Sequence, residues 1–192
     1  MKLNKDCKFP ESRLEPEPGT LYIVGTPIGN LNDLSPRAKR ILKDVSLIAC
    51  EDTRRSGQLL KVIESKVAMI SYHKHNLKSR LNQILEILKE NQSVALISDA
   101  GMPAISDPGQ ELVIAAKENK HQIICIPGPC AAITALAISG LESQRFCYEG
   151  FLPRKKSTRK KRLIDISKEE RTTIIYESPH QLVNLLKELS IY

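Results

Sequence analysis

The sequence predicts an α/β protein of two domains, in which a parallel five-stranded N-terminal sheet carries helices on both faces. Three observations predict this fold class. Short apolar runs rich in β-branched residues alternate with segments of helical apolar spacing as far as residue 140. The strand-like runs are apolar throughout, as in strands buried on both faces of a parallel sheet. The regular alternation of strand and helix patterns ends after Gly140. We therefore expect an N-terminal domain over 19–141 and the start of an α/β C-terminal domain over 142–192.

Five strands are predicted in the first domain, at 19–25, 45–52, 66–73, 93–98 and 121–127. The first helix has Ser35 at its N-cap and Pro36 at N1. A second helix is predicted at 53–63, and a third follows the strand at 66–73. Two apolar stripes support the first and third helices: Ala38, Ile41, Leu42 and Val45, then Leu77, Leu81, Ile84, Leu85 and Leu88.

The next helix is predicted to start at Asp107, because Pro108 and Gln110 complete a capping pattern. A helix over 128–140 ends at Gly140, which suits a helix C-terminus. In the second domain, strands are predicted at 145–153 and 171–180. A last helix repeats the cap pattern and has an apolar stripe, built from Ser178, Pro179 and Gln181, then Leu182, Leu185, Leu186 and Leu189.

Composition excludes several classes of protein. The chain has 192 residues, of which 41% are hydrophobic and 27% charged, as in ordinary globular proteins. No apolar run approaches the roughly 20 residues needed to span a membrane, and residues 1–18 contain no secretory apolar segment. We expect residues 1–18 to be a disordered tail and the protein to be cytoplasmic. The five cysteines are odd in number and lack CxxC spacing, with Cys50 and Cys125 in predicted core strands, which favours reduced thiols and no metal site.

Positive charge is concentrated in one segment. The formal net charge is +7, and "RKKSTRKKR" at 154–162 places seven cations in nine residues. Such density favours a phosphate backbone as partner, although a solvated helix surface has the same composition. Only 4% of residues are aromatic, which argues against an extended stacking platform for single strands.

Four loops rich in Gly and Pro follow predicted strands, at the sheet edge where open α/β proteins bind ligands. They read "GTPIGN", "CEDTR", "SDAGMPAISDPG" and "PGPCAA". Their glycines allow backbone to approach a ligand closely, and Glu51, Asp52 and Asp99 suit hydroxyl or ammonium groups. The alternative is that each loop only turns the chain. A dinucleotide fingerprint is absent because Gly25 and Gly29 are four residues apart, and no Walker motif or GxSxG elbow occurs.

Together the motifs resemble one family, the ribosomal RNA small-subunit methyltransferase I type of the tetrapyrrole-methylase superfamily. The resemblance runs from Gly19 to the end of the chain. It is carried by "GTLYIVGTPIGNLNDLSPRA", "LIACEDTRRSGQLL", "ISYHKHN", "VALISDAGMPAISDPG", "IPGPCAAITALAISGL", "FCYEGFLPRKK" and "IIYESPH".

This resemblance implies a two-domain, tetrapyrrole-methylase-like fold that binds S-adenosylmethionine between its domains. It further implies 2′-O-methylation of a cytidine in the decoding region of 16S rRNA in the small ribosomal subunit, and a homodimer. The cofactor residues that it implies are Gly25, Thr26, Pro27, Gly29, Asn30, Ser98, Asp99, Ala100, Gly101, Pro127, Gly128, Pro129, Tyr176, Glu177 and Ser178. The RNA-binding candidates are Arg54, Arg154, Lys155, Lys156, Arg159, Lys160, Lys161 and Arg162.

A ribose hydroxyl is a weak nucleophile, so we expect a general base. Asp99 is preferred because it lies in the densest loop, with Glu51 and His73 as further catalytic candidates. Asp52 and Glu177 are also considered, and Asp99 or Asp52 could instead only cap a helix or turn. Arg55 could meet RNA phosphate or only solvent.

Three departures from the family pattern stand out. Cys130 and Met102 replace residues that usually carry a hydroxyl. Family members usually continue past Tyr192, so we expect the C-terminal domain to be incomplete.

Two other functions remain open from the sequence. One is a methylase of a small molecule, of tetrapyrrole or diphthine type, which would not need the basic cluster. The other is a non-catalytic RNA-binding or assembly factor that retains the fold.

Overall fold

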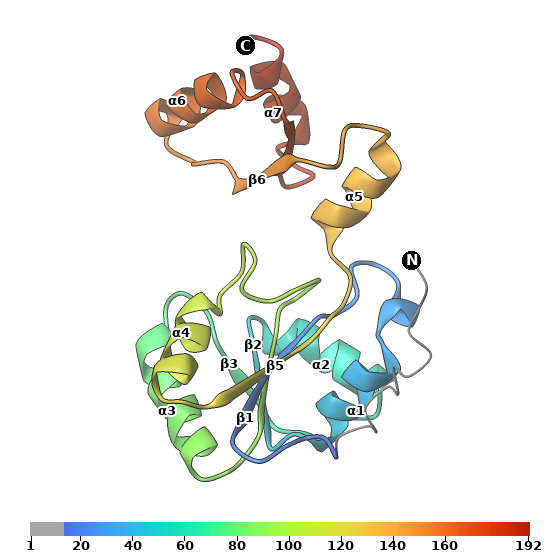
Figure 1. Cartoon of the computed structure of the whole chain (residues 1–192), viewed down its shortest axis with the longest axis vertical. Coiled ribbons are helices and arrows are strands. Elements are labelled where there is room, and N and C mark those ends of the chain that lie inside the picture. Colours follow the sequence, from blue (N-terminus) through green and yellow to red (C-terminus); the bar gives the residue numbers. More distant parts are fainter. Residues whose placement is uncertain (1–13) are drawn as a thin grey trace, which may run out of the picture. The chain divides into compact units, whose positions relative to one another are not determined.

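The computed structural model describes residues 14–192 and contains two compact units, which divide between Gly128 and Pro129 (Figure 1). The sequence predicted the division near residue 142. The difference is the helix α5 (Ala131–Ser139), which packs against β7 of the second unit. The Tyr176 hydroxyl at the end of β7 accepts a hydrogen bond from the Ala132 backbone N–H at 3.1 Å, and this bond ties α5 to the second unit.

The first unit is built on a five-stranded parallel sheet of order β3-β2-β4-β1-β5, as predicted. The three central strands, β1, β2 and β4, are buried along their whole length, because both faces are covered. The strands are β1 (Thr20–Val24), β2 (Leu47–Cys50), β3 (Met69–Ser71), β4 (Val94–Ile97) and β5 (Gln122–Ile126).

Helices cover both faces of this sheet, which confirms the predicted layers. The helices α1 (Pro36–Asp44) and α2 (Thr53–Val62) share one core with the sheet, centred on Tyr22 and Ile48. On the opposite face, α3 (Leu77–Lys89) and α4 (Gln110–Glu118) form a second core with alternate strand residues such as Leu21. Figure 1 shows these two pairs on opposite sides of the sheet.

The strand order fixes where a ligand crevice forms. Strands β1 and β4 are neighbours, yet β1 leads to α1 on one face and β4 leads to α4 on the other. Their loops therefore separate at the carboxyl edge of the sheet, which is the topological switch point where open α/β folds bind ligands.

The edge strand β5 corrects one expectation. It pairs only with β1, and Cys125 is exposed rather than part of the core. Cys50 on the central strand β2 is buried as predicted, and the four described cysteines are free thiols.

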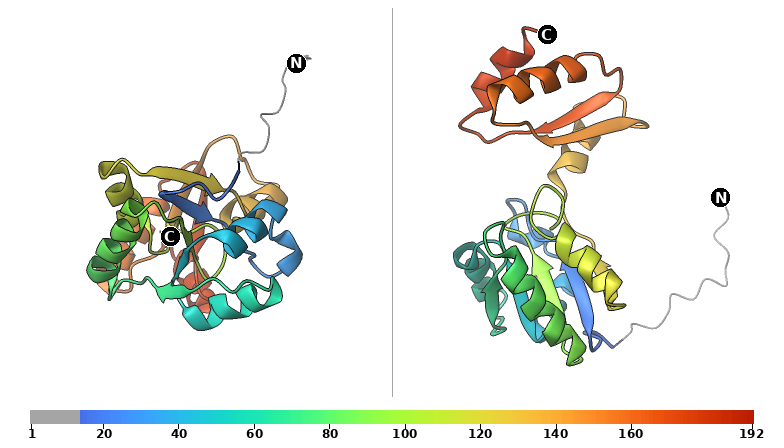
Figure 2. Two further views of the ribbon diagram at one scale, coloured as in Figure 1. Left: turned by 90° about the horizontal axis from the view of Figure 1, so that it is seen from below. Right: turned by 90° about the vertical axis from the view of Figure 1, so that its left-hand side faces the viewer.

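The second unit contains a parallel pair of strands, β6 (Phe146–Phe151) and β7 (Thr172–Tyr176), joined through α6 (Lys156–Ile166) and followed by α7 (Leu182–Leu189). The right-hand view of Figure 2 shows α6 and α7 on one side of this pair. Its core is small: Leu152, Leu163 and Leu185 are its buried members.

Two of the predicted helix ends are confirmed and two are wrong. The Ser35 hydroxyl accepts the Ala38 N–H at 3.0 Å at the start of α1, and Gly140 ends α5 in the left-handed region. In contrast, α4 begins at Gln110 after Gly109, so Asp107 is not its cap. Likewise, α7 begins after Gln181 with no side-chain cap, so the predicted start at Ser178 is wrong.

The predicted N-terminal tail falls mainly on residues 1–13, which lie outside the described residues. Residues 14–18 are described, and they are held by specific contacts. The Glu15 carboxylate accepts a hydrogen bond from Arg37 Nε at 2.8 Å, and the Glu17 backbone N–H donates to the Tyr22 hydroxyl at 2.7 Å. The predicted disorder therefore does not extend to this part of the tail.

Residues 14–192 form no helix that is both long and apolar enough to cross a membrane.

Candidate functional site

The loops after β1 and β4 are joined to each other at the switch point. Thr26 and Gly101 exchange two backbone hydrogen bonds, of 2.9 and 3.1 Å. The Thr26 hydroxyl donates to the Ser98 carbonyl at 3.2 Å, and the Ser98 hydroxyl donates to the Gly101 carbonyl at 3.3 Å. Both hydroxyl-bearing residues are buried. Thr26 and Ser98, two predicted cofactor residues, therefore shape the loop backbone with their side chains.

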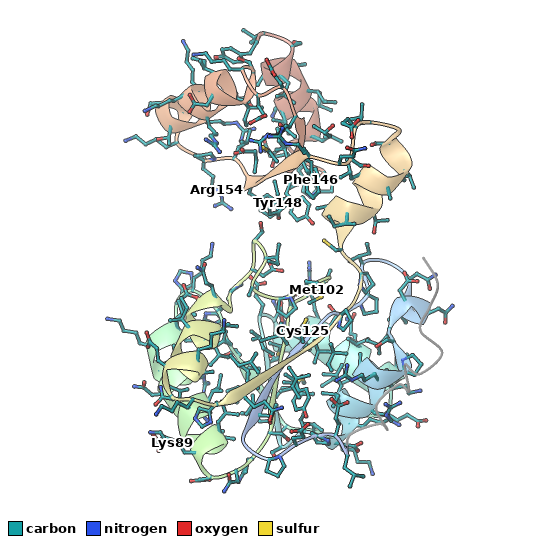
Figure 3. The ribbon with its side chains drawn as sticks, viewed as in Figure 1. Lys89, Met102, Cys125, Phe146, Tyr148 and Arg154 are labelled. Carbon is teal, nitrogen blue, oxygen red and sulfur yellow. The ribbon has the colours of Figure 1, made fainter. Side chains whose placement is uncertain are left out.

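The loop after β5 meets these two loops through a glycine pair. A Cβ added to Gly25 would lie 2.6 Å from the Gly128 Cα and 2.7 Å from the Met102 sulfur. Only glycines allow this approach of two backbones. The structure thus brings together residues of all three predicted cofactor loops, and the Met102 side chain, labelled in Figure 3, lies beside Gly25.

Two carboxylates at this edge already have partners. Asp52 caps α2 by accepting the Arg54 N–H at 2.9 Å, and hydrogen bonds from the Arg54 guanidinium lower the pKa of Asp52 to about 2. Asp99 accepts the Asp52 backbone N–H at 3.2 Å and lies 3.3 Å from an Arg55 guanidinium nitrogen. The sequence left open whether Asp52 and Asp99 act as bases or only cap a helix or turn. In the structure Asp52 caps a helix, and Asp99 links the ends of β2 and β4.

Glu51 differs from both. Within residues 14–192, its side chain has no hydrogen bond or ion pair, and burial raises its pKa, with further contributions from Asp107 and Asp99. It lines a pocket of about 550 Å³ at the ends of β2, β3 and β4. The other lining residues are Asp52, Thr53, Arg54, Arg55, Ser71, His73 and Asp99. The three predicted catalytic candidates thus lie around one pocket.

His73 is the most constrained of these candidates. Its backbone N–H donates to the Asn76 side chain at 2.9 Å, and its Nδ1 accepts the His75 backbone N–H at 3.3 Å. A ring nitrogen that already accepts a hydrogen bond is less available to take a proton from a substrate.

Asp107, which the sequence identified only as a helix cap, is a carboxylate close enough to Glu51 and Asp99 to affect them. Burial raises its pKa, Asp99 raises it further, and a hydrogen bond with Ser98 opposes the shift. The signal available in the sequence was its position in the same long loop as Asp99.

A second pocket of about 430 Å³ shares Asp99 and Arg55 with the first. Its walls combine an apolar surface with the Asp99 carboxylate and the Arg55 guanidinium. It is lined by Thr26, Pro27, Leu31, Arg55, Gln58, Leu59, Val62 and Asp99. Asp99 therefore borders both pockets of the carboxyl edge.

The remaining predicted cofactor residues of the first unit lie on the loops around these pockets. Asn30 caps the short 3-10 helix η1 (Leu31–Asp33) by accepting the Asn32 N–H at 3.0 Å. Asn30 is exposed, and so are three others on their loops, namely Gly29, Ala100 and Pro127. Pro129 is the first residue of the second unit.

In the second unit, the predicted residue Tyr176 ends β7, and Glu177 and Ser178 follow it. The Glu177 carboxylate accepts the Ser178 backbone N–H at 2.9 Å and an Arg159 guanidinium N–H at 3.1 Å. The Tyr176 ring makes edge contacts with Tyr148 and Phe151 (Figure 3 labels Tyr148), and burial raises its pKa. These contacts hold the Tyr176–Ser178 segment in a defined conformation.

The structure separates the predicted RNA-binding cations into two groups. Arg159 pairs with Glu177 and Glu188, and Arg162 makes a bidentate pair with Glu149 at 2.6 and 2.8 Å. In the first unit, Arg54 pairs with Asp52. The other cations of the segment have no ion pair within residues 14–192, namely Arg154, Lys155, Lys156, Lys160 and Lys161.

Across the described part of the chain, no group of three or more His, Cys, Asp or Glu side chains is arranged to hold a metal ion.

Comparisons with known proteins agree with this architecture. Residues 20–192 match the family described as tetrapyrrole (corrin/porphyrin) methylases. A solved cobalt precorrin-4 methyltransferase of cobalamin biosynthesis superposes with a TM-score of 0.67 at 18% identity, over 90% of this chain and 74% of that one. A uroporphyrin-III C-methyltransferase from Thermus thermophilus superposes with a TM-score of 0.55 at 20% identity, over 77% of this chain and 74% of that one. These two structures support the fold.

Among curated proteins, the chain is 49% identical to the ribosomal RNA small subunit methyltransferase I of Synechocystis sp., over 91% of this chain and 62% of that protein. It is 48% identical to the protein of the same name in Escherichia coli O157:H7, over 89% of this chain and 60% of that protein. The chain thus spans about 60% of the length of the curated relatives that it matches.

Proposed function

The chain belongs to the tetrapyrrole (corrin/porphyrin) methylase family, and from this premise we propose that it is an S-adenosylmethionine-dependent ribosomal RNA methyltransferase. In this proposal it methylates the ribose 2′-hydroxyl of a cytidine in the decoding region of 16S rRNA. The names of relatives at 48–49% identity support an rRNA substrate. The observation that carries the proposal is the carboxylate of Glu51, which has no partner within residues 14–192, in the pocket beside Asp99.

The carboxyl edge of the first unit has the chemistry that S-adenosylmethionine requires. The cofactor carries an ammonium group, a sulfonium group and ribose hydroxyls, all of which favour carboxylate oxygens as neighbours. Asp99 offers such a carboxylate at the border of two pockets, one of which has an apolar wall. We propose that Asp99 holds the cofactor together with the loops at 25–30, 98–101 and 127–129, and that Tyr176, Glu177 and Ser178 complete its site.

When bound, the cofactor supplies an electrophilic methyl group on a sulfonium centre. The chain's own residues then have two tasks. Asp99, held by the Asp52 N–H and by Arg55, orients its ligand without moving. Glu51 takes the proton of the ribose hydroxyl, because its raised pKa and free oxygens suit a general base.

The RNA partner follows from the cations that have no carboxylate neighbour. Arg154, Lys155, Lys156, Lys160 and Lys161 are exposed on the loop before α6 and on its first turns. We propose that they contact the phosphate backbone of 16S rRNA in the small subunit. A homodimer, which the resemblance implies, and a cytoplasmic location, which the cysteine pattern favours, belong to the same proposal.

Calorimetry with S-adenosylmethionine tests the enzyme against a non-catalytic RNA-binding factor. We expect saturable binding of one cofactor per chain. If the chain binds RNA but releases no heat of binding with the cofactor, the result would support a non-catalytic RNA-binding factor. Methyl transfer to a tetrapyrrole or to diphthine precursors, without transfer to RNA, would support the small-molecule methylase.

A further inference from the structure

The second unit contains a pocket of about 770 Å³ in which no ligand has been placed so far. Its lining includes Arg154 and Lys156, proposed above as RNA contacts, and Glu177 and Ser178, proposed above as cofactor residues. It lies among the end of β6, the start of α6, the loop after β7, and α7. Its lining residues are Phe151, Leu152, Arg154, Lys156, Arg159, Glu177, Ser178, Gln181, Asn184, Lys187 and Glu188.

The two carboxylates of this pocket are both bound to Arg159. Arg159 Nε donates to Glu188 at 2.7 Å, and its Nη2 donates to Glu177 at 3.1 Å. The Arg159 side chain is only 16% exposed, so this arrangement is largely sheltered from solvent. Arg159 therefore offsets one of the two negative charges and links the segment after β7 to α7, although the sequence predicted it as an RNA contact.

Three cations of the lining remain without an ion pair within residues 14–192. They are Arg154 on the loop after β6 (Figure 3), Lys156 at the start of α6, and Lys187 on α7. All three are exposed. Because they come from three separate elements, the fold itself gathers positive charge at this pocket, which favours an anion.

The uncharged lining has the character of a nucleoside site. Phe151 is 57% exposed at the end of β6, so a face or edge of its ring is available for a planar group. Asn184 and Gln181 carry amides, which are joined by a 3.0 Å hydrogen bond. Aromatic stacking with amide hydrogen bonds is how proteins bind unpaired RNA bases. A single exposed aromatic ring fits one base, in agreement with the low aromatic content of the chain.

We propose that this pocket binds one nucleotide of single-stranded RNA, with its phosphate at Arg154, Lys156 and Lys187 and its base against Phe151. The inference rests on the proposed function, since it places part of the RNA substrate. It adds Phe151, Asn184 and Lys187 to the RNA-binding residues, and it assigns Arg159 to structure. The pocket volume of about 770 Å³ is sufficient for one nucleotide.

The test uses the 192-residue chain and a labelled single-stranded RNA 12-mer of mixed sequence, with binding measured by fluorescence anisotropy at several salt concentrations. Lys187→Ala should lower affinity about 3-fold to 10-fold and make the log–log salt slope less negative by about 0.7, as expected for one lost phosphate contact on a single strand. Lys168→Ala removes an exposed lysine of the same unit outside the pocket, and it should change neither quantity.

Phe151→Ala should lower affinity at least about 5-fold with an unchanged salt slope, because stacking is not ionic. Phe146→Ala, on the same strand but outside the pocket, is its matched control. Normal affinity in both Lys187→Ala and Phe151→Ala would overturn the inference. Equal competition by polyglutamate would overturn it too, since the pocket would then accept acidic peptides.

Cofactor calorimetry on the same variants distinguishes a failure of the pocket assignment from a failure of the proposed function. Unchanged cofactor binding with unchanged RNA binding in the variants refutes only the pocket. Absent cofactor binding in the parent chain refutes the proposed function, whatever the pocket binds.

Discussion

At the scale of single residues, the environment of Glu51 separates it from its acidic neighbours. Asp52 and Asp99 are held by backbone N–H groups and arginines, whereas the carboxylate of Glu51 has no such partner within residues 14–192. Burial and the nearby Asp107 and Asp99 raise the pKa of Glu51. A group that keeps its proton to higher pH gives the folded state an advantage at low pH, which is lost as pH rises through its pKa.

Glu51→Gln should therefore have opposite effects on activity and stability. Removal of the general base is expected to lower the methyl-transfer rate about 100-fold to 10,000-fold. At neutral pH the variant should unfold at a slightly higher temperature, because the buried charge is gone. Below the ordinary glutamate pKa range the parent carboxyl is protonated in both states, so this gain should disappear. Thermal unfolding at both pH values, with single-turnover rates, checks the pair.

Asp99→Asn tests the second residue of the site. The amide keeps the size of the side chain but loses the charge that attracts a cationic ligand. We expect cofactor affinity to fall about 10-fold by calorimetry, as for the loss of a hydrogen bond to a charged group. Lys168→Ala serves as a control at a distant exposed position. Normal cofactor affinity of Asp99→Asn would reduce Asp99 to a link between β2 and β4.

Residue types in the sequence predicted a candidate site but did not rank its members. The sequence favoured Asp99 as the base because its loop is dense in special residues. The hydrogen bond from the Asp52 N–H and the Arg55 pair hold Asp99 in place, and for this reason we propose Glu51 as the base. Asp107 was interpreted only as a helix cap. Such partners come from other strands, so no local pattern reveals them.

At the scale of elements, the glycine pair formed by Gly25 and Gly128 holds two of the three loops against each other. The contact is between backbones, so neither side can move away as a flexible side chain would. Gly25→Ala should destabilise the chain by about 1–3 kcal/mol through overpacking, and it should displace the loops that we assign to the cofactor.

Gly57→Ala is the matched control for this variant. Its added Cβ would meet only the Met69 methyl at 3.5 Å, within the helix α2. Because alanine favours helix over glycine, the control should gain up to about 1 kcal/mol. Chemical denaturation of both variants gives the comparison, and equal stability of the two would contradict the role of the glycine pair.

Sequence patterns predict the existence of the strands and helices but not every helix boundary. All seven strands and the alternation of helices were predictable from apolar runs, and the Ser35 cap from its neighbours. The start of α4 was not predictable. A Cβ on Gly109 would lie 2.7 Å from a Leu96 methyl on β4, and φ there is +147°. This tertiary contact places the turn at Gly109, beyond the Asp107–Pro108 pair.

At the scale of the whole molecule, the net charge of +7 is less informative than its distribution. Arg159 and Arg162 serve ion pairs inside the second unit, while the lysines of the same segment do not. The segment 154–162 thus has a structural and a potential RNA-binding part, which its composition alone could not divide.

The combined change of Lys155, Lys156, Lys160 and Lys161 to Ala tests the second part. We expect much weaker RNA binding, a salt slope less negative by up to about 3, and unchanged cofactor affinity. The control replaces four exposed helical lysines of the first unit and so keeps the same net charge, namely Lys39, Lys61, Lys78 and Lys117. Equal losses in the two variants would show that only total charge matters.

The most direct test of the central claim is methyl transfer to small ribosomal subunits that lack the modification. The chain is incubated with subunits and S-adenosylmethionine, and ribose methylation is mapped along 16S rRNA. We predict one new 2′-O-methylated cytidine in the decoding region, and a much slower reaction with Glu51→Gln. Methylation of a base instead of a ribose, or no methylation of the RNA, would contradict it.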